Sequence, residues 1–162
     1  MRILVTAASK HGTTAQVADH LATRFTDAGF DVDRKNPEDV ASIDGYDAVV
    51  CGSAVYMTRW MPQARQFLRR FADQLRKRKV WAFSVGISNV LNGQAQDPSR
   101  IGPVLLDIEV VHHQTFAGRY QPTTLSLRER SIARLAGAVE GDFRDWDTID
   151  HWADSIIQTL EQ

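Results

Sequence analysis

The sequence predicts an α/β protein whose parallel sheet is covered by helices on both faces. Short apolar runs alternate along the chain with longer segments whose apolar residues recur at helical spacing. The run over residues 46–55 is almost continuously apolar, which is typical of a strand buried on both faces. Such alternation implies right-handed crossovers between parallel strands. The 162 residues fit one domain, predicted to span 1–162.

The first third of the chain predicts strand, helix and strand in turn. An apolar run from Arg2 to Ala7 predicts a buried strand. A helix is expected from Thr13, with a buried face formed by Val17, Ala18, Leu21, Ala22 and Phe25. Gly29 suits the end of this helix, and a second strand is expected from Phe30 to Arg34.

The remaining elements continue the alternation. The third strand, from Tyr46 to Val55, follows an Asp-Gly turn, and Pro62 suits the first position of the next helix. The apolar stripe of that helix is Ala64, Phe67, Leu68, Phe71 and Leu75. Fourth and fifth strands are expected at Lys79–Gly86 and at about Val110–Gly118.

Two helices are expected to close the chain. The first is marked by Ile132, Leu135, Ala136 and Val139. The second follows an N-cap at Asp145 or Asp147, and its apolar stripe is Ile149, Trp152, Ala153, Ile156, Ile157 and Leu160.

Composition favours a cytoplasmic protein. Cys51 is the single cysteine, so no intrachain disulfide can form and a reducing compartment is expected. No apolar run approaches the ~18 residues of a transmembrane helix. The first residues enter an apolar strand directly, without the features of a signal peptide.

The charge is unevenly distributed although the net charge is only −1. The segment 65–79 holds seven basic side chains and one acid, so it carries +6 and the rest of the chain −7. Two interpretations stay open, a solvated helix face or a surface that attracts acidic partners or anionic lipid. The second would add peripheral contact with the inner membrane face. No nucleic-acid partner is predicted.

The loop after the first strand predicts a phosphate site. Its residues are Ser9, Lys10, His11, Gly12, Thr13 and Thr14. They offer hydroxyls, a flexible glycine and the free N–H groups of a helix N-terminus, which bind phosphate without a cation. An ordinary helix cap is the alternative. The glycines of the Walker and dinucleotide motifs are missing, so we interpret Asp33, Arg34 and Lys35 as solvated charges.

This loop is similar to the flavodoxin phosphate loop, written T/S-x-T-G-x-T. The match is at Ser9, Gly12 and Thr14, while His11 stands where the family has a small hydroxyl residue. The resemblance implies a three-layer flavodoxin-like sandwich with five parallel strands in the order 2-1-3-4-5. It also implies FMN as the cofactor, bound at the carboxyl ends of the strands.

The resemblance further implies two loops around the isoalloxazine. In the loop after the third strand, the residues concerned are Ser53, Ala54, Val55 and Tyr56. An aromatic residue commonly covers the flavin there, and Tyr56 is the first candidate and Trp60 the second. The loop that wraps the pyrimidine edge with backbone groups would contain Ser84, Val85, Gly86 and Gly93.

More specifically, the chain resembles the bacterial menaquinone-dependent protoporphyrinogen oxidase branch of the flavodoxin-like family. The segments that carry this resemblance are 49–54, 83–85 and 116–118, together with the Trp146-containing entry to the last helix. The chain departs from that branch over 86–100 and 119–130. The resemblance implies electron transfer from a porphyrinogen to a quinone.

Three functions therefore stay open. The first is an FMN-dependent oxidoreductase directed at a quinone or porphyrinogen. The second is an electron carrier that docks on redox-protein partners, although carriers are typically strongly acidic around the flavin and this chain is not. The third is a deazaflavin-binding relative, because Lys10 and His11 add positive charge beside the phosphate site.

The sequence lacks the residues that other proteins with such a sheet, or a metal site, would require. A response regulator needs an aspartate after the third strand, and a low-molecular-weight phosphatase needs a cysteine in the first loop. His112 and His113 are adjacent in a strand, so they should point to opposite faces and share no metal. No Ser–His or His–Asp pair stands at catalytic spacing, and the catalytic residues stay unassigned.

Overall fold

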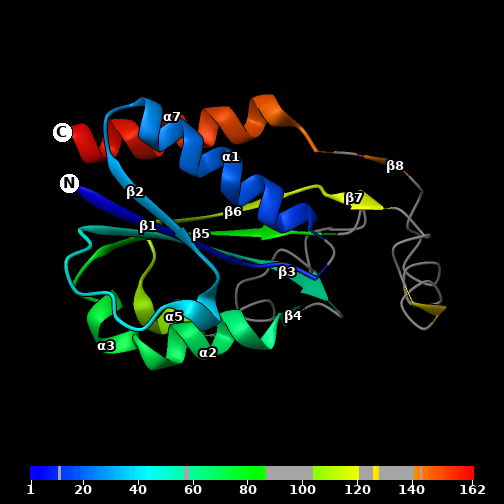
Figure 1. Ribbon diagram of the computed structural model, residues 1–162, viewed down its shortest axis with the longest axis horizontal. Coiled ribbons are helices and arrows are strands. Elements are labelled where there is room, and N and C mark those ends of the chain that lie inside the picture. The colour runs from blue at the N-terminus through cyan, green and yellow to red at the C-terminus, as the bar shows by residue number, and fades with distance from the viewer. Residues whose placement is uncertain (11, 57–58, 87–103, 121–125, 128–140, 143) are drawn as a thin grey trace.

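A computed structural model describes residues 1–10, 12–56, 59–86, 104–120, 126–127, 141–142 and 144–162. Its main sheet has five parallel strands in the order β2-β1-β3-β5-β6 (Figure 1). This is the predicted order 2-1-3-4-5, because β5 and β6 are the fourth and fifth predicted strands. The strands are β1 (Arg2–Ala8), β2 (Asp31–Lys35), β3 (Ala48–Tyr56), β5 (Lys79–Val85) and β6 (His112–Phe116).

Three two-residue strands were not predicted. β4 (Arg59–Trp60) folds back on β3 in antiparallel register, with Val55 opposite Trp60. β7 (Arg119–Tyr120) pairs with β8 (Gly141–Asp142) in a separate sheet. Such short segments show no periodicity in the sequence, so only their partner strands define them.

Helices cover both faces of the sheet, as predicted. One face carries α1 (Thr13–Asp27) and α7 (Trp146–Glu161), and the other carries α2 (Pro62–Arg70), α3 (Ala72–Leu75) and α5 (Val104–Ile108) (Figure 1). A short 3₁₀ helix, η1, spans Pro37–Asp39. Alternate strand residues point to opposite faces and so build two separate cores. Val50 belongs to the core under α1 and α7, and its neighbour Val49 to the core under α2.

Gly52 in β3 leaves room for the Phe83 ring of the neighbouring strand β5. A Cβ atom at this position would lie 2.3 Å from the Phe83 ring. Phe83 is fully buried and packs against Phe116 and Trp152, with ring centroids 6.2 and 5.9 Å away. The ring therefore occupies the space that a side chain would need.

The predicted helix over residues 62–75 begins at Pro62, as expected, but it is divided. α2 ends at Arg70, and Phe71 leaves the helical region with φ −109° and ψ 16° before α3 starts. The apolar stripe continues across the break, since Phe67, Phe71 and Leu75 are all buried. Spacing alone cannot show a break that preserves the buried face. The predicted helix around Ile132 to Val139 lies outside the described residues.

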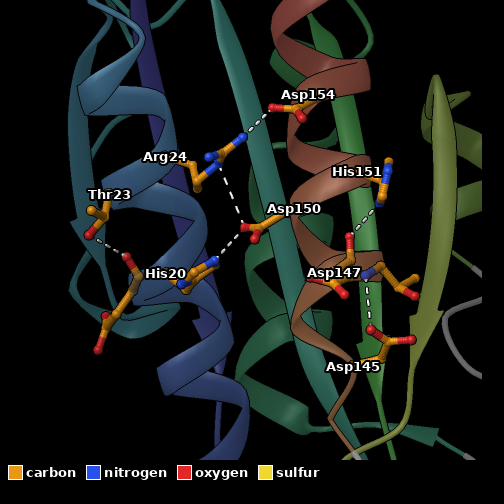
Figure 2. A network of polar contacts seen from close by, with 10 residues as sticks. His20, Thr23, Arg24, Asp145, Asp147, Asp150, His151 and Asp154 are labelled. Carbon is orange, nitrogen blue, oxygen red and sulfur yellow. Dashed lines mark hydrogen bonds and ion pairs between the residues drawn. The ribbon is translucent and has the colours of Figure 1, made fainter.

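α7 has the predicted N-cap at Asp145, whose carboxylate accepts a hydrogen bond of 3.2 Å from the Thr148 N–H (Figure 2). The hydrogen bond with the Thr148 side chain, followed by this backbone bond, lowers the pKa of Asp145. Figure 2 also shows the side chains that join α7 to α1. His20 contacts the Asp150 carboxylate at 2.6 Å, and Arg24 forms an ion pair with Asp154.

No His–Asp pair stands at catalytic spacing in the sequence, but the fold forms one between distant residues. His20 and Asp150 are 130 residues apart, and the packing of α1 against α7 brings them together. Both side chains are about one-third exposed and lie between two helices, so the pair fastens the two helices together.

Two charges in β2, Asp33 and Arg34, were wrongly interpreted as solvated. Asp33 accepts hydrogen bonds from the Tyr46 hydroxyl at 2.6 Å and from the Arg2 guanidinium at 2.5 Å. The bond from Tyr46, with a smaller contribution from Arg2, lowers the pKa of Asp33, and burial raises the pKa of Tyr46 to about 12. Arg34 donates to Asp19 at 3.0 Å. β2 therefore uses these charges to fix its position at the edge of the sheet.

Within the described ranges, no helix combines the length and the apolar character needed to cross a bilayer. Cys51 is buried, and burial raises the pKa of its thiol to about 12.

Candidate functional site

The loop between β1 and α1 lies at the carboxyl edge of the sheet, where the winding direction reverses beside β1. In open α/β sheets this switch point is where ligands bind. Gly12 adopts a left-handed conformation with φ 87°, which a glycine accepts without strain. Its N–H donates to the Ser9 hydroxyl oxygen at 3.1 Å, so the loop turns back on itself. Lys10 is exposed, and His11 lies outside the described residues.

The first turn of α1 provides the predicted N–H groups. The first intrahelical hydrogen bond runs from the Gln16 N–H to the Gly12 carbonyl, at 3.0 Å. The N–H groups of Thr13, Thr14 and Ala15 precede it, so helix geometry leaves them for a ligand or solvent. Together with the helix dipole they attract an anion. The Thr14 side chain is buried, whereas that of Thr13 is half-buried.

A cavity of about 220 Å³ opens beside this loop. Its walls come from four segments of the chain: Ala7, Ala8, Ser9, Gly12, Ala15, Asn36, Glu38, Met61 and Gln63. Asn36 and Glu38, which follow β2, were not among the predicted site residues. The strand order could have indicated them, because β2 ends beside β1 at the same edge of the sheet.

Two side chains of the second predicted loop, those of Ser53 and Val55, make contacts inside the protein. Ser53 is fully buried, and its hydroxyl donates to the Ala54 carbonyl at 2.8 Å while accepting from the Met61 N–H at 2.9 Å. Val55 packs in the core under α2. Tyr56 ends β3 and pairs with Arg59, but its side chain lies outside what the structure describes.

Trp60, the second aromatic candidate, is a core residue. It is 1% exposed, and its indole N–H donates to the Ser84 hydroxyl at 2.8 Å. The same hydroxyl lies 2.7 Å from Nε2 of His113. Burial lowers the pKa of His113 to about 4, so the imidazole is neutral at pH 7.

The fold also forms a Ser–His pair that the spacing along the sequence does not show. The pair joins β5 to β6, where Ala82 stands opposite His113 and Ser84 opposite Thr115. Because Ser84 is fully buried and also accepts from an indole, the pair holds the Trp60 ring beneath the β3–β4 hairpin.

The third predicted loop begins where the segment after β5 contacts the backbone at the end of β6. Val85 is buried in the core under α1 and α7. The Gly86 N–H donates to the Phe116 carbonyl at 3.2 Å. A Cβ on Gly118 would lie 1.9 Å from the Gly86 oxygen, so Gly118 permits this close approach. Gly93 lies outside the described residues.

The predicted opposite orientation of His112 and His113 is confirmed. His112 Nδ1 accepts from the Trp152 indole N–H at 2.9 Å on the α7 side, whereas His113 contacts Ser84 on the α2 side. In the described part of the chain, no group of three or more His, Cys, Asp or Glu side chains could hold a metal ion.

Solved structures resemble this fold at low sequence identity. A flavodoxin mutant from Pseudomonas aeruginosa is 13% identical over all of both chains, with a TM-score of 0.60. The two-electron reduced flavodoxin of Megasphaera elsdenii is 18% identical over 72% of this chain and 85% of its own, with a TM-score of 0.59.

A larger enzyme contains a similar part. The rubredoxin oxygen:oxidoreductase of Desulfovibrio gigas is 14% identical over 85% of this chain, with a TM-score of 0.60, but the chain spans only 35% of that enzyme. No curated protein matches the chain in sequence.

A match to a protein-family model identifies the family of this chain. The model of the flavodoxin domain aligns with residues 4–147, which include the β1–α1 loop and most of the sheet. Flavodoxins bind FMN at this switch point, so the predicted cofactor is confirmed at the level of the family. With its strand order, its phosphate-type loop and this match, the chain belongs to the flavodoxin domain family.

Proposed function

We propose that this protein is an FMN-dependent oxidoreductase that exchanges electrons with a quinone or a porphyrinogen. The observation that carries the cofactor part is the left-handed Gly12 at the start of α1, beside a cavity at the switch point. The substrate part rests on the resemblance to the protoporphyrinogen oxidase branch. It also rests on the charge, because the chain lacks the strong acidity of carrier flavodoxins.

The residues present fit an FMN phosphate. The N–H groups of the first turn of α1 would bind its oxygens, and the half-buried Thr13 hydroxyl could add a further donor. We expect the Tyr56 ring to stack on the isoalloxazine and the Gly86 backbone to meet its pyrimidine edge. When bound, FMN supplies the redox chemistry, while these residues bind and orient it.

The cofactor part is tested by titrating the purified protein with FMN, FAD and NADPH. Calorimetry measures the binding of all three, and flavin fluorescence that of FMN and FAD. FMN should bind most tightly, and riboflavin, which lacks the phosphate, should bind more weakly than FMN. Tighter binding of NADPH than of FMN would refute the assignment.

The substrate part is tested by mixing the FMN-loaded protein with protoporphyrinogen and a menaquinone analogue. Porphyrin fluorescence should rise faster than in the protein-free control. The second candidate is an electron carrier, favoured by the full-length likeness to a flavodoxin. Rapid electron transfer between a reductase and a cytochrome, without porphyrin formation, would support the carrier instead.

Membrane contact through the basic segment 65–79 is a further part of the proposal. Four of its arginines donate to backbone carbonyls within the protein: Arg65 to Trp60, Arg70 to Val40, Arg76 to Asp107 and Arg78 to Tyr46. These side chains stabilise the fold, so a lipid contact would depend on the other exposed cations of the segment, Arg69, Lys77 and Lys79.

This division sharpens the membrane test. A variant with Arg69, Lys77 and Lys79 changed to Gln should bind anionic liposomes more weakly, by about 1 kcal/mol per charge, and keep its melting temperature. Binding of the unchanged protein should also fall with salt, because exposed charges are screened over ~8–10 Å. Equal binding of the variant and the unchanged protein would refute membrane contact through this segment.

A further inference from the structure

The entry to α7, which contains Trp146, is organised around Arg144. This residue lies between β8 (Gly141–Asp142) and the N-cap Asp145. Its side chain is 7% exposed, whereas that of Arg24 on the neighbouring helix α1 is 37% exposed. Arginine side chains are almost never buried without partners, so the surroundings of Arg144 should supply several.

The first partner of Arg144 is Asp142 of β8. Two guanidinium nitrogens donate to the two carboxylate oxygens, Nε to Oδ1 at 2.9 Å and Nη2 to Oδ2 at 2.6 Å. The Arg144 N–H also donates to Oδ1, at 3.1 Å. Such paired hydrogen bonds fix the orientation of the guanidinium as well as its position. Because β8 pairs with β7, this contact joins the two-stranded ribbon to the start of α7.

The other partners of Arg144 lie on the two helices. Nη1 donates to the side-chain oxygen of Gln16 on α1, a residue 128 positions earlier in the chain. The guanidinium also lies over the Trp146 ring, 5.0 Å from its centroid, which is within the range of a cation–π interaction. The Trp146 ring contacts that of His20, with centroids 4.8 Å apart, and His20 contacts Asp150 (Figure 2). Arg144 therefore joins α1, α7 and the ribbon.

Gln16 closes the first turn of α1, a turn that lacks the usual stabilising groups. The Gln16 N–H forms the first hydrogen bond of the helix, to the Gly12 carbonyl. In the described part of the chain no side chain caps this helix, and its first turn contains no acidic residue. α7 has both features, a cap at Asp145 and an acid in its first turn. Since a helix cap contributes ~1 kcal/mol, α1 lacks a stabilisation that α7 has.

A side-chain cap on α1 would occupy an N–H group that a phosphate could bind. A contact through the Gln16 side chain avoids this conflict, because it holds the turn and leaves the N–H groups of Thr13, Thr14 and Ala15 open. Arg144 makes this contact, while its hydrogen bonds to Asp142 keep the guanidinium in place.

We propose that Arg144 is a positioning residue for the flavin phosphate: acting through Gln16, it fixes the first turn of α1 in the geometry that binds phosphate. The inference deepens the proposed function and rests on its placement of the phosphate at this turn. It also gives a role to the Trp146-containing entry to α7, because the Trp146 ring supports the guanidinium.

Calorimetric titration with FMN and with riboflavin separates the phosphate from the rest of the flavin. Arg144→Met and Gln16→Ala should each weaken FMN binding by about tenfold, as expected for the loss of one hydrogen bond that involves a charged group, and leave riboflavin binding unchanged. The double variant should bind FMN no more weakly than Arg144→Met, because both changes remove the same contact. Gln16 is exposed on a helix, so Gln16→Ala should fold even if Arg144→Met does not.

Two further variants serve as controls. Arg144→Lys keeps the positive charge but lacks the planar fork that reaches Asp142 and Gln16 together, so it should behave like Arg144→Met. Arg24→Met removes a cation from the same interface between α1 and α7, in the last turn of α1, and should leave the preference for FMN over riboflavin unchanged.

The ratio of FMN to riboflavin affinity decides the outcome. The proposal is overturned if Arg144→Met and Gln16→Ala keep the preference for FMN, or if Arg24→Met lowers it as much. Full FMN affinity in Arg144→Lys would also overturn it, because the charge alone would then explain the effect. If the unchanged protein binds riboflavin as tightly as FMN, the phosphate does not lie at this turn, and the proposed phosphate site and this inference are both refuted.

Discussion

Replacing Gly118 by Ala should push apart the segments that follow β5 and β6, at the proposed flavin site. The new Cβ would lie 1.9 Å from the Gly86 oxygen, and such contacts are essentially never shorter than 3.0 Å. Because the neighbour is a backbone atom, no side-chain rotation can relieve the clash. The two segments must therefore move apart by about 1 Å.

This movement should break the hydrogen bond from the Gly86 N–H to the Phe116 carbonyl, which is already 3.2 Å long. Leaving a buried backbone group without a partner costs ~1–3 kcal/mol. For a chain of this size each kcal/mol lowers the melting temperature by ~2–4 °C. We therefore expect Gly118→Ala to lower it by about 2–12 °C and to weaken FMN binding, because Gly86 begins the loop proposed for the pyrimidine edge.

Gly52→Ala is the matched control for this prediction. Its new Cβ would meet the Phe83 ring at 2.3 Å, so the clash falls on a core side chain and costs ~1–3 kcal/mol by overpacking. Thermal melts and FMN titrations well below the melting temperature should show similar instability in both variants, but a loss of FMN affinity only in Gly118→Ala. An unchanged melting temperature of Gly118→Ala, or an equal loss of affinity in both variants, would refute the reasoning.

Three further changes test the site and the core. Tyr56→Ala should weaken FMN binding by ~1–3 kcal/mol in a fluorescence titration, through lost burial and stacking, whereas Trp60→Ala should chiefly lower stability, by ~3–5 kcal/mol in a denaturant melt. Gly12→Ala should cost ~1–3 kcal/mol in stability by backbone strain at φ 87° and should weaken FMN more than it weakens riboflavin. Because burial lowers the pKa of His113 from 6.5 to about 4, unfolding takes up a proton between these values. Stability should therefore fall as the pH is lowered from about 6.5 to 4, and His113→Gln should flatten this part of the curve in melts at several pH values.

The sequence by itself determined the elements whose signals are local. The period of the apolar residues predicted α1, α2 and α7, and apolar runs predicted β1 and β3. The other three long strands were expected from the alternation of elements, to within a few residues. The helix start at Pro62 and the N-cap at Asp145 follow from the chemistry of single residues. The loop at Gly12 could be predicted for the same reason, because a strand, a glycine and a helix start are contiguous in the chain.

Only the tertiary structure decided which distant residues meet. The contact of Ser84 with His113 depends on the register of β5 and β6, and that of His20 with Asp150 depends on how α1 packs against α7. The burial of Trp60 follows from the fold-back of β4, a pairing too short to leave a pattern. These contacts are set by strand order, register and helix packing, which are properties of the whole assembly of elements. Spacing along the chain carries no information about them, because the partners lie tens of residues apart.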